Sequence, residues 1–158
     1  GEVVIPERVI PDIKKVLWKT VPPQYVITVD NRDAFVSMPL PANTLLIHAP
    51  ASDTRMAEQL LCALTTDIPW SHLGDLSPEG IKKTAGFAER LQRPLSLYLP
   101  ENWPDYLKLL GTPLPPDEQW PLNLIPRPLQ IKLRYLLENR RKIPQQAMVY
   151  AKKWVHEL

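Results

Sequence analysis

Short apolar blocks separated by turn residues run along the first third of the chain and predict one helix and two strands. The spacing over residues 7–20 is helical, and Pro22-Pro23 ends that element. Residues 25–29 are rich in β-branched and aromatic side chains and predict a strand. Because residues 30–33 supply turn chemistry, residues 34–38 are expected to pair with that strand as a hairpin.

A strand–helix–helix–strand unit is predicted next. Residues 44–48 hold a continuous apolar run, which is typical of a strand covered on both faces. A helix follows to about residue 66, and a second begins at Ser77, where a cap residue precedes a first-turn proline and an acid. Residues 94–99 alternate apolar and polar positions and predict another strand. This order predicts a parallel crossover, which together with the hairpin makes the sheet mixed.

Prolines dominate the chain after this unit. Residues 94–128 contain nine of them, yet residues 112–128 also keep large apolar side chains, so we expect that segment to be an extended arm on the domain surface. Residues 129–158 show two helical apolar faces separated near Pro144, which predicts a helical hairpin. The predicted fold class is α+β. A small mixed β-sheet of about four strands, flanked by helices, is expected over residues 1–111, and the hairpin is expected to pack on it.

Composition narrows the possible functional classes. The chain has 158 residues, of which 44% are hydrophobic and 23% charged, which suits one folded domain. No apolar run is long enough to cross a membrane, so no membrane partner is expected. Cys62 is the single cysteine, which excludes an internal disulfide and favours a reducing compartment, so we predict a cytoplasmic protein. The three histidines are far apart in sequence, and we expect no metal and no cofactor.

The two ends of the chain lack the usual start and stop signals. The sequence begins at Gly1 rather than Met, and its last predicted helix reaches Leu158 without Gly, Asn or Pro. We therefore expect the chain to be a domain cut from a longer polypeptide.

Positive charge is concentrated toward the C-terminus. Residues 1–126 carry a net charge of −4 and residues 127–158 a net charge of +6. Clustered Lys and Arg on a helical corner suit the phosphates of nucleic acid or the surface of an acidic protein. Cations near helix C-termini also occur for purely structural reasons, so both interpretations stay open. The candidate residues for this surface are Arg127, Lys132, Arg134, Arg140, Arg141, Lys142, Gln145, Lys152 and Lys153, and Gln145 could contact adenine edges.

The turn after residues 44–48 is a candidate ligand site, because ligands of open α/β sheets lie beyond the carboxyl ends of strands. It contains His48, Ser52 and Asp53, which could form a base, a nucleophile and an orienting acid. The turn has no glycine and no Gly-Lys-Ser/Thr sequence, which argues against a phosphate loop. A structural role, with Ser52 or Asp53 as a helix cap, explains the same residues.

Two pairs of acids lie close together in sequence, Asp75 with Glu79 and Glu101 with Asp105. Paired carboxylates can perform acid–base chemistry, but Glu79 and Asp105 occupy predicted first turns of helices, where acids are electrostatically favoured. Cys62 lies in a predicted helix among leucines and is expected to be a small core residue. The sequence therefore yields no coherent catalytic set.

These features favour a non-catalytic interaction domain of a larger intracellular protein. Trp103, Trp120 and Leu122 lie among prolines, where rigid apolar side chains suit protein docking. The expected partner is another protein or further domains of the same polypeptide, bound through the arm and the basic hairpin. The first alternative is a nucleic-acid-binding domain that uses the basic hairpin. The second is a small hydrolase or transferase with its site at the His48–Asp53 turn.

Overall fold

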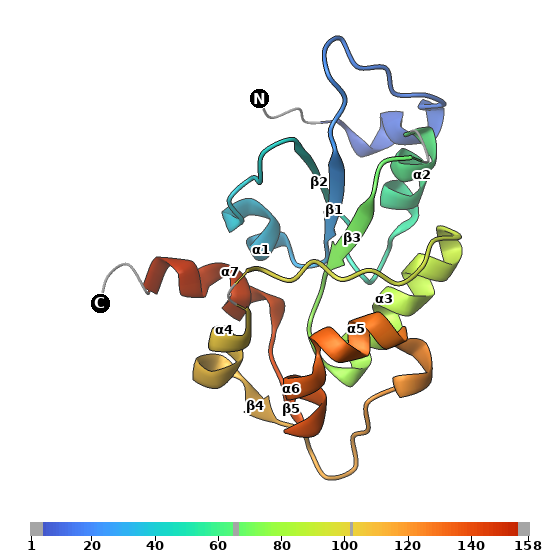
Figure 1. Cartoon of the computed structure of the whole chain (residues 1–158). Helices are drawn as coiled ribbons and strands as arrows, with labels where there is room; N and C mark the ends of the chain where they lie inside the picture. The colour runs from blue at the N-terminus through green and yellow to red at the C-terminus, as the bar shows by residue number, and fades with distance from the viewer. Residues whose placement is uncertain (1–4, 65–66, 102, 155–158) are drawn as a thin grey trace.

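A parallel sheet stands at the centre of the computed structural model, which describes residues 5–64, 67–101 and 103–154 (Figure 1). Its three strands are β1 (Tyr25–Val29), β2 (Thr44–His48) and β3 (Trp70–Leu73), in the order β2-β1-β3. β1 lies in the middle, and four of its five residues are buried. Its β-branched residues suit a strand that is covered on both faces.

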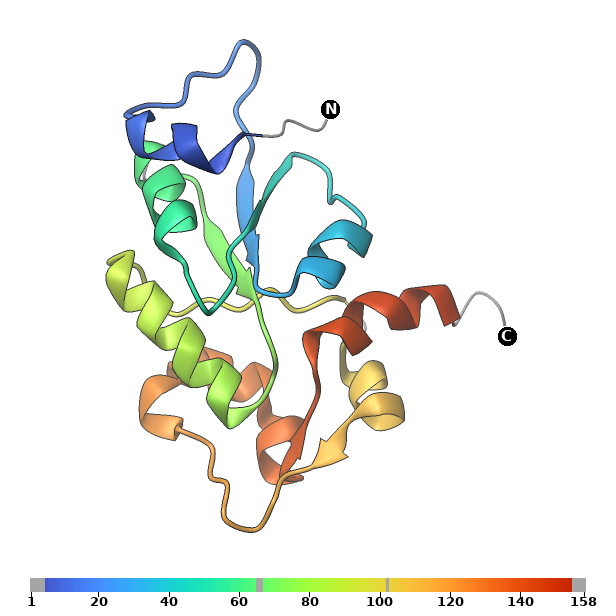
Figure 2. The same ribbon diagram turned by 180° about the vertical axis from the view of Figure 1, so that it is seen from behind.

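Helices cover both faces of this sheet (Figure 2). One face packs against α2 (Arg55–Ala63) and α3 (Pro78–Arg90), with Val26, Leu61 and Phe87 in a shared apolar cluster. A second and larger cluster takes Ile27 and Val29 from β1 and joins them to α1 (Arg32–Ser37) and to the C-terminal helices. Because side chains alternate along β1, successive residues point to opposite faces of the sheet and belong to two separate apolar clusters.

The α+β class is confirmed, with a sheet flanked by helices, but the predicted hairpin is absent. Residues 34–38 lie in and just after α1, whose N-cap Asn31 accepts a hydrogen bond from the Ala34 N–H at 2.9 Å. Ala34 and Met38 are four residues apart, so a helical turn buries both on one face. β1 and β2 are consequently parallel, joined by a helical crossover.

Three further elements differ from the predictions. β3 pairs in parallel with β1, although the pattern does not predict a strand there. The strand predicted at 94–99 contributes one parallel bridge, between Leu97 and His72. The helix predicted over residues 7–20 is reduced to the 3-10 helix η1 (Glu7–Asp12). In the described part of the chain, antiparallel strands occur in a separate small sheet, made of β4 (Thr112–Pro113) and β5 (Arg141–Lys142).

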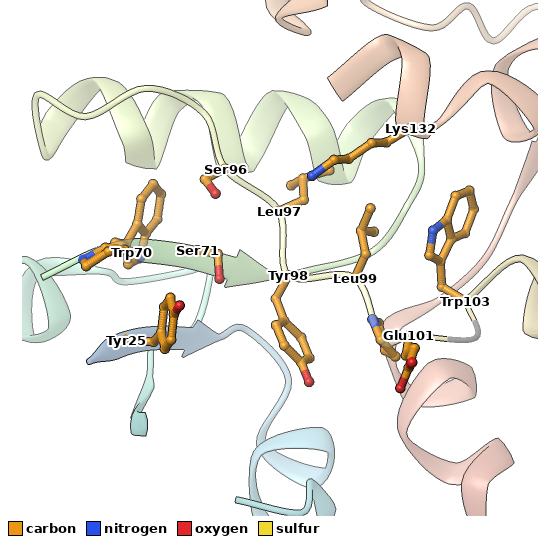
Figure 3. A pocket seen from close by; sticks show the side chains of 12 residues that line it. Tyr25, Trp70, Ser71, Ser96, Leu97, Tyr98, Leu99, Glu101, Trp103 and Lys132 are labelled. Carbon is orange, nitrogen blue, oxygen red and sulfur yellow. The ribbon is translucent and has the colours of Figure 1, made fainter. Parts of the chain in front are cut away.

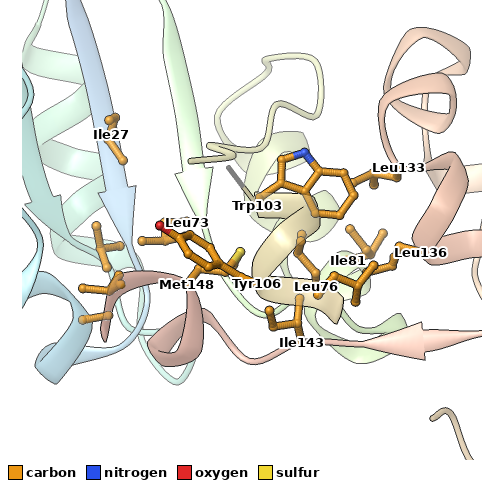
Figure 4. Packing of buried hydrophobic residues seen from close by; sticks show 14 of the residues in the cluster. Ile27, Leu73, Leu76, Ile81, Trp103, Tyr106, Leu133, Leu136, Ile143 and Met148 are labelled. Carbon is orange, nitrogen blue, oxygen red and sulfur yellow. The ribbon is translucent and has the colours of Figure 1, made fainter. Parts of the chain in front are cut away.

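The C-terminal third packs into the larger core. Its helices are α4 (Trp103–Leu110), the 3-10 helix η2 (Leu122–Leu124), α5 (Arg127–Lys132), α6 (Arg134–Glu138) and α7 (Gln145–Trp154). Leu133, Leu136 and Ile143 are buried in one cluster with Leu76 and Tyr106 (Figure 4). The basic hairpin therefore lies against the domain, and its corner contains β5. No helix in the described ranges is both long and apolar enough to cross a bilayer.

The basic run after α6 holds the proline-rich arm. The Arg140 guanidinium donates to the carbonyl oxygens of Pro115 and Glu118 at 3.3 and 2.9 Å. Lys142 pairs with the Glu118 carboxylate at 3.4 Å. These contacts fix the arm in place, and its residue Leu114 is buried.

Candidate functional site at the carboxyl end of the sheet

Polar side chains gather beyond the carboxyl ends of β1 and β3. Asp30 follows β1 directly, and Gly74-Asp75 follows β3. Both aspartates line one pocket of about 50 Å³, which we call the carboxyl-end pocket; its wall also includes His72, Glu79, Lys83 and Thr84. Because the chain leaves β1 for β2 on one side and returns to β3 on the other, this pocket lies where open parallel sheets bind ligands.

Gln145 links the two aspartates. It is the first residue of α7 and is only 2% exposed. Its backbone N–H donates to Asp75 Oδ1 at 2.8 Å, and its side-chain Nε2 donates to Asp30 Oδ2 at 3.4 Å. Two backbone hydrogen bonds between Leu76 and Ile143 bring it there. Contrary to the sequence-based expectation, the Gln145 side chain is therefore not available to adenine edges.

The remaining lone pairs of these carboxylates decide what the pocket can bind. Asp30 Oδ1 accepts a hydrogen bond from the Ala51 N–H at 2.6 Å. Asp75 Oδ2 has no hydrogen-bond partner among the described residues. Carboxylate oxygens keep further lone pairs after one hydrogen bond, so both groups retain the capacity to bind a cation.

α3 begins at the rim of the pocket. Ser77 is its N-cap, and Ser77 Oγ accepts a hydrogen bond from the Gly80 N–H at 3.0 Å. A Cβ on Gly80 would lie 2.1 Å from the Asp75 carbonyl oxygen, so glycine allows the helix to approach Asp75 closely. Lys83 pairs with Glu79 at 2.8 Å, and this hydrogen bond lowers the pKa of Glu79 and raises the pKa of Lys83.

His72 is a buried titratable side chain in the pocket wall, 5% exposed. Its Nδ1 lies 2.8 Å from Thr28 Oγ1, which also accepts a hydrogen bond from Trp70 Nε1 at 2.9 Å. The Phe87 ring packs edge-on against the imidazole, with centroids 5.5 Å apart. Burial lowers the pKa of His72 to about 4, and the nearby Asp30 charge opposes this effect. The ring is thus neutral at pH 7, and no described residue hydrogen-bonds to its Nε2.

A larger cavity lies beside β3 (Figure 3). It has a volume of about 520 Å³, and we call it the aromatic cleft because Tyr25, Trp70, Tyr98 and Trp103 line it. The Tyr25 ring is exposed, and burial raises the pKa of the Tyr98 phenol. Lys132 extends from α5 over the cleft (Figure 3). A cavity of this size suits a small ligand or one nucleotide unit.

The predicted turn at His48, Ser52 and Asp53 adjoins the carboxyl-end pocket at Asp30. His48 Nε2 lies 3.2 Å from the Asp30 carbonyl oxygen, and the Ala51 N–H of the same turn donates to Asp30 Oδ1. Arg55 pairs with Asp53 at 2.6 Å and lowers the pKa of that carboxyl to about 2. Ser52 is exposed, and Thr54 is the N-cap of α2 in place of Ser52 or Asp53. The structure therefore brings no His–Ser–Asp set together at this turn.

Some of the basic candidate side chains form hydrogen bonds or ion pairs within the protein, and others are exposed without an ion-pair partner among the described residues. Arg134 pairs with Glu138 at 2.7 Å, and Arg141 donates to the Gly111 carbonyl oxygen. Arg140 and Lys142 hold the arm as described above. Lys152 and Lys153 lie in α7, but their side chains fall outside what the structure describes. Arg127 and Lys132 are exposed on α5 and have no ion-pair partner among the described residues.

The predicted docking residues differ in exposure. Trp103 is buried in the larger core, so its ring packs inside the protein. Trp120 is partly buried against the same core, and its Nε1 is buried with no hydrogen-bond partner among the described residues. Leu122 is 51% exposed and keeps most of its side chain free. Cys62, expected in the core, is exposed.

The two predicted acid pairs have different fates in the structure: the first pair lines one pocket, and the members of the second have different surroundings. Asp75 and Glu79 line the same pocket. Asp105 instead pairs with Lys108 at 3.9 Å, while Glu101 is exposed at the aromatic cleft. Only the first pair therefore faces a possible ligand in common.

Comparison of the chain with protein-family models, with curated proteins and with solved structures found no match. The pocket must therefore be interpreted from its own chemistry. Within the described ranges, no group of three or more His, Cys, Asp or Glu side chains is arranged to hold a metal ion. A cation at Asp30 and Asp75 would need water and ligand oxygens to complete its coordination.

The sequence patterns do not single out Asp30 or His72. Asp30 lies in a segment with turn chemistry, and His72 lies in a strand that the pattern does not predict. One feature of the sequence could have indicated Asp30, because this acid directly follows the correctly predicted strand at residues 25–29. An acid at that position faces the ligand-binding end of a parallel sheet.

Proposed function

We propose that the protein is a metal-dependent phosphoryl-transfer enzyme, a phosphodiester hydrolase, whose cation is held by Asp30 and Asp75. The observation that supports this is the convergence of two carboxylates, from the ends of adjacent parallel strands, on one polar pocket. Mg²⁺ usually keeps several waters and uses one or two protein carboxylates together with substrate phosphate oxygens. The carboxyl-end pocket offers that number of ligands.

The charge of the pocket is consistent with a bound cation. Lys83 offsets the charge of Glu79, with which it pairs, so Asp30 and Asp75 leave the pocket negatively charged. This charge would repel a phosphate, and a divalent cation between the two aspartates would reverse the effect. A divalent cation held by Asp30 and Asp75 would supply an activated water and would offset the charge of the substrate phosphate. Hydrolysis would form one P–O bond from water and break the P–O bond to the leaving alcohol, which would take up a proton from solvent.

The test compares Asp30→Asn and Asp75→Asn with Asp117→Asn, an exposed aspartate in the arm. For the unaltered protein, we expect Mg²⁺ or Mn²⁺ to raise the melting temperature, because a ligand that binds only the folded state stabilises it. Each pocket variant should lose this response. The rate at which each variant hydrolyses bis-p-nitrophenyl phosphate should be lower than that of the unaltered protein by a factor of at least about 100. Asp117→Asn should keep both properties.

The substitutions are chosen to preserve the fold. In Asp75→Asn the side-chain oxygen can still accept the hydrogen bond from the Gln145 N–H, so without a cation this variant should melt close to the unaltered protein. In Asp30→Asn the one side-chain oxygen can accept from the Ala51 N–H or from Gln145 Nε2 but not from both, so this variant should melt somewhat lower and its cation response is compared with its own cation-free value. A protein that ignores both cations, or a response that survives both pocket substitutions, would contradict the proposal.

The aromatic cleft favours a second candidate function, the binding of single-stranded nucleic acid. Tyr25 and Tyr98 offer rings on which bases could stack, and Lys132 offers a cation for a phosphate. Stacking on such rings contributes about 1–3 kcal/mol per base. Nucleic-acid binding is also the first alternative predicted from the sequence. In this version the binding surface is the aromatic cleft with Lys132 of α5, because Arg140 and Lys142 contact the arm. Protein docking on the arm stays a prediction, with Leu122 as its exposed apolar side chain.

Fluorescence anisotropy with labelled single-stranded DNA, at low and physiological salt, tests the second candidate. Tyr25→Ala and Lys132→Ala should weaken binding, and Lys132→Ala should also flatten its salt dependence. Lys82→Ala, on the exposed side of α3, serves as the matched lysine control. Binding that is absent at low salt, or equally affected by Lys82→Ala, would rule out the cleft.

A further inference from the structure

The hydrogen-bond relay through Trp70, Thr28 and His72 fixes the position of each proton. An indole Nε1–H can only donate, so Thr28 Oγ1 is the acceptor in its 2.9 Å contact with Trp70. The Thr28 hydroxyl proton then needs an acceptor, because Thr28 is 0% exposed. Among the described residues its one further partner is His72 Nδ1, at 2.8 Å. Nδ1 therefore accepts, and the single proton of the neutral ring lies on Nε2.

The Nε2–H of His72 faces the carboxyl-end pocket. A Cβ placed on Gly74, another residue of the pocket wall, would lie 3.2 Å from Nε2. Nε2 has no partner in the described part of the chain, and it is not among the atoms that are fully enclosed without one. The pocket wall thus contains a buried donor for which the described residues supply no acceptor.

We propose that His72 donates a hydrogen bond from Nε2–H to an oxygen of the ligand in the carboxyl-end pocket, and that Thr28 is the positioning residue that fixes this tautomer. The inference rests on the proposed function, in which that oxygen belongs to a cation-bound phosphate. A neutral donor suits this place because it binds a phosphate oxygen without forming an ion pair with Asp30. Trp70 orients Thr28 and thereby sets the direction of the relay.

The alternative role for His72 is that of a third metal ligand. Nε2 would then need to be unprotonated, and Nδ1–H would donate to Thr28 Oγ1. Thr28 would accept from both Trp70 and His72, and its own proton would be left without an acceptor in a fully buried position. The cost of such an unpaired group favours the donor role.

Nuclear magnetic resonance of the ¹⁵N-histidine-labelled chain tests the tautomer directly. The chain has three histidines, so the spectrum is simple, and His72→Gln identifies the His72 signals. At pH 7 without ligand, we expect Nε2 to be protonated and Nδ1 unprotonated. Thr28→Val should produce a mixture of the two tautomers. Thr84→Val is the matched control, because Thr84 is also buried in this region but donates to the Gly80 carbonyl oxygen.

Adding ligands then separates the two roles of His72. Mg²⁺ alone should leave Nε2 protonated, and Mg²⁺ with inorganic phosphate should shift the Nε2–H resonance. Phosphate affinity in the presence of Mg²⁺ should fall about tenfold in His72→Phe. His72→Gln should recover part of it through its amide N–H. A protonated Nδ1 in the free protein, loss of the Nε2 proton on adding Mg²⁺ alone, or no Nε2–H shift with phosphate would overturn the inference.

These outcomes are distinguishable from a failure of the proposed function. The tautomer is measured without any ligand, whereas the cation site is judged from the melting response of Asp30→Asn and Asp75→Asn. A protein that keeps the cation response but shows a protonated Nδ1 retains the proposed function and refutes the role of His72.

Discussion

His72 shows how burial alone can set the ionisation state of a side chain. Burial lowers its pKa to about 4 from the ordinary value of 6.5, and the opposing Asp30 charge does not compensate. Between these two pH values the unfolded chain binds a proton that the folded protein does not bind. The free energy of unfolding must therefore depend on pH in this window.

We expect the free energy of unfolding to fall as the pH drops from about 6.5 to about 4, by up to about 3 kcal/mol from His72. Above this window both states are neutral at this ring, and the contribution is constant. Urea unfolding across this range without divalent cations, for the unaltered protein and for His72→Gln, provides the measurement. The carboxylates are common to both proteins, so the difference between the two slopes isolates His72. Parallel slopes would contradict a buried, neutral imidazole.

At the residue scale, sequence patterns reveal local roles and hide distant ones. Ser77 and Pro78 are predicted to start a helix, and Ser77 is indeed the N-cap of α3. By contrast, Asp30 and Gln145 are separated by 115 positions, and no local spacing relates them. Their contact depends on the pairing of residue 76 with residue 143, which exists only in the completed fold.

At the element scale, the first turn of α3 is fitted to the strand-end loop that carries Asp75. Gly80→Ala would place a Cβ 2.1 Å from the Asp75 carbonyl oxygen, so the helix or the loop must move. We expect a loss of about 1–3 kcal/mol in the free energy of unfolding, measured by chemical denaturation. Gly86→Ala lies in the same helix and meets only the end of a flexible arginine at 3.4 Å.

The control substitution Gly86→Ala should not lower the free energy of unfolding. Alanine in a helix interior is favoured over glycine by up to about 1 kcal/mol, so Gly86→Ala should be neutral or stabilising. If both substitutions shift stability equally, helix propensity rather than the close approach at Gly80 controls this element.

Two of the failed predictions concern elements of only four to six residues. Five residues at 34–38 are compatible with either a helical or an extended period, and the capping role of Asn31 decides between them. β3 has four residues and follows Pro69, which weakens its strand pattern. The longer α3, which combines a cap with a sustained apolar face, is predicted and present. Apolar spacing alone does not suffice, because the helix predicted over residues 7–20 has no side-chain N-cap hydrogen bond and is reduced to η1.

At the scale of the whole molecule, the C-terminal helices and the sheet share one core. The apolar face at Leu129, Leu133, Leu136 and Leu137 is predicted from its spacing. The first three side chains are buried, and Leu137 is partly buried against the same core. Spacing cannot say which surface such a face covers, because apolar contact is not directional. The consequence reaches the carboxyl-end pocket, since α7 leaves the same core and delivers Gln145 to Asp30 and Asp75.

This shared core predicts one cooperative unfolding transition. Leu133 is 0% exposed, so Leu133→Ala should lower the free energy of unfolding by about 2–5 kcal/mol through lost contacts and a residual cavity. Ile131, two residues away on α5, is 68% exposed, and Ile131→Ala should change stability by no more than about 0.5 kcal/mol. Both variants are followed by far-ultraviolet circular dichroism and by tryptophan fluorescence during urea unfolding.

The two signals distinguish a shared core from an appended hairpin. Circular dichroism follows mainly the helices, and fluorescence reports on the buried sheet when Trp70 is kept as the single tryptophan and the other four are replaced by phenylalanine. In a single cooperative unit both transitions shift together in Leu133→Ala and remain coincident. If the circular dichroism transition moves alone, the C-terminal helices unfold separately. Gln145 would then leave Asp30 and Asp75 while the sheet is still folded, and the pocket would lose the residue that holds its carboxylates together.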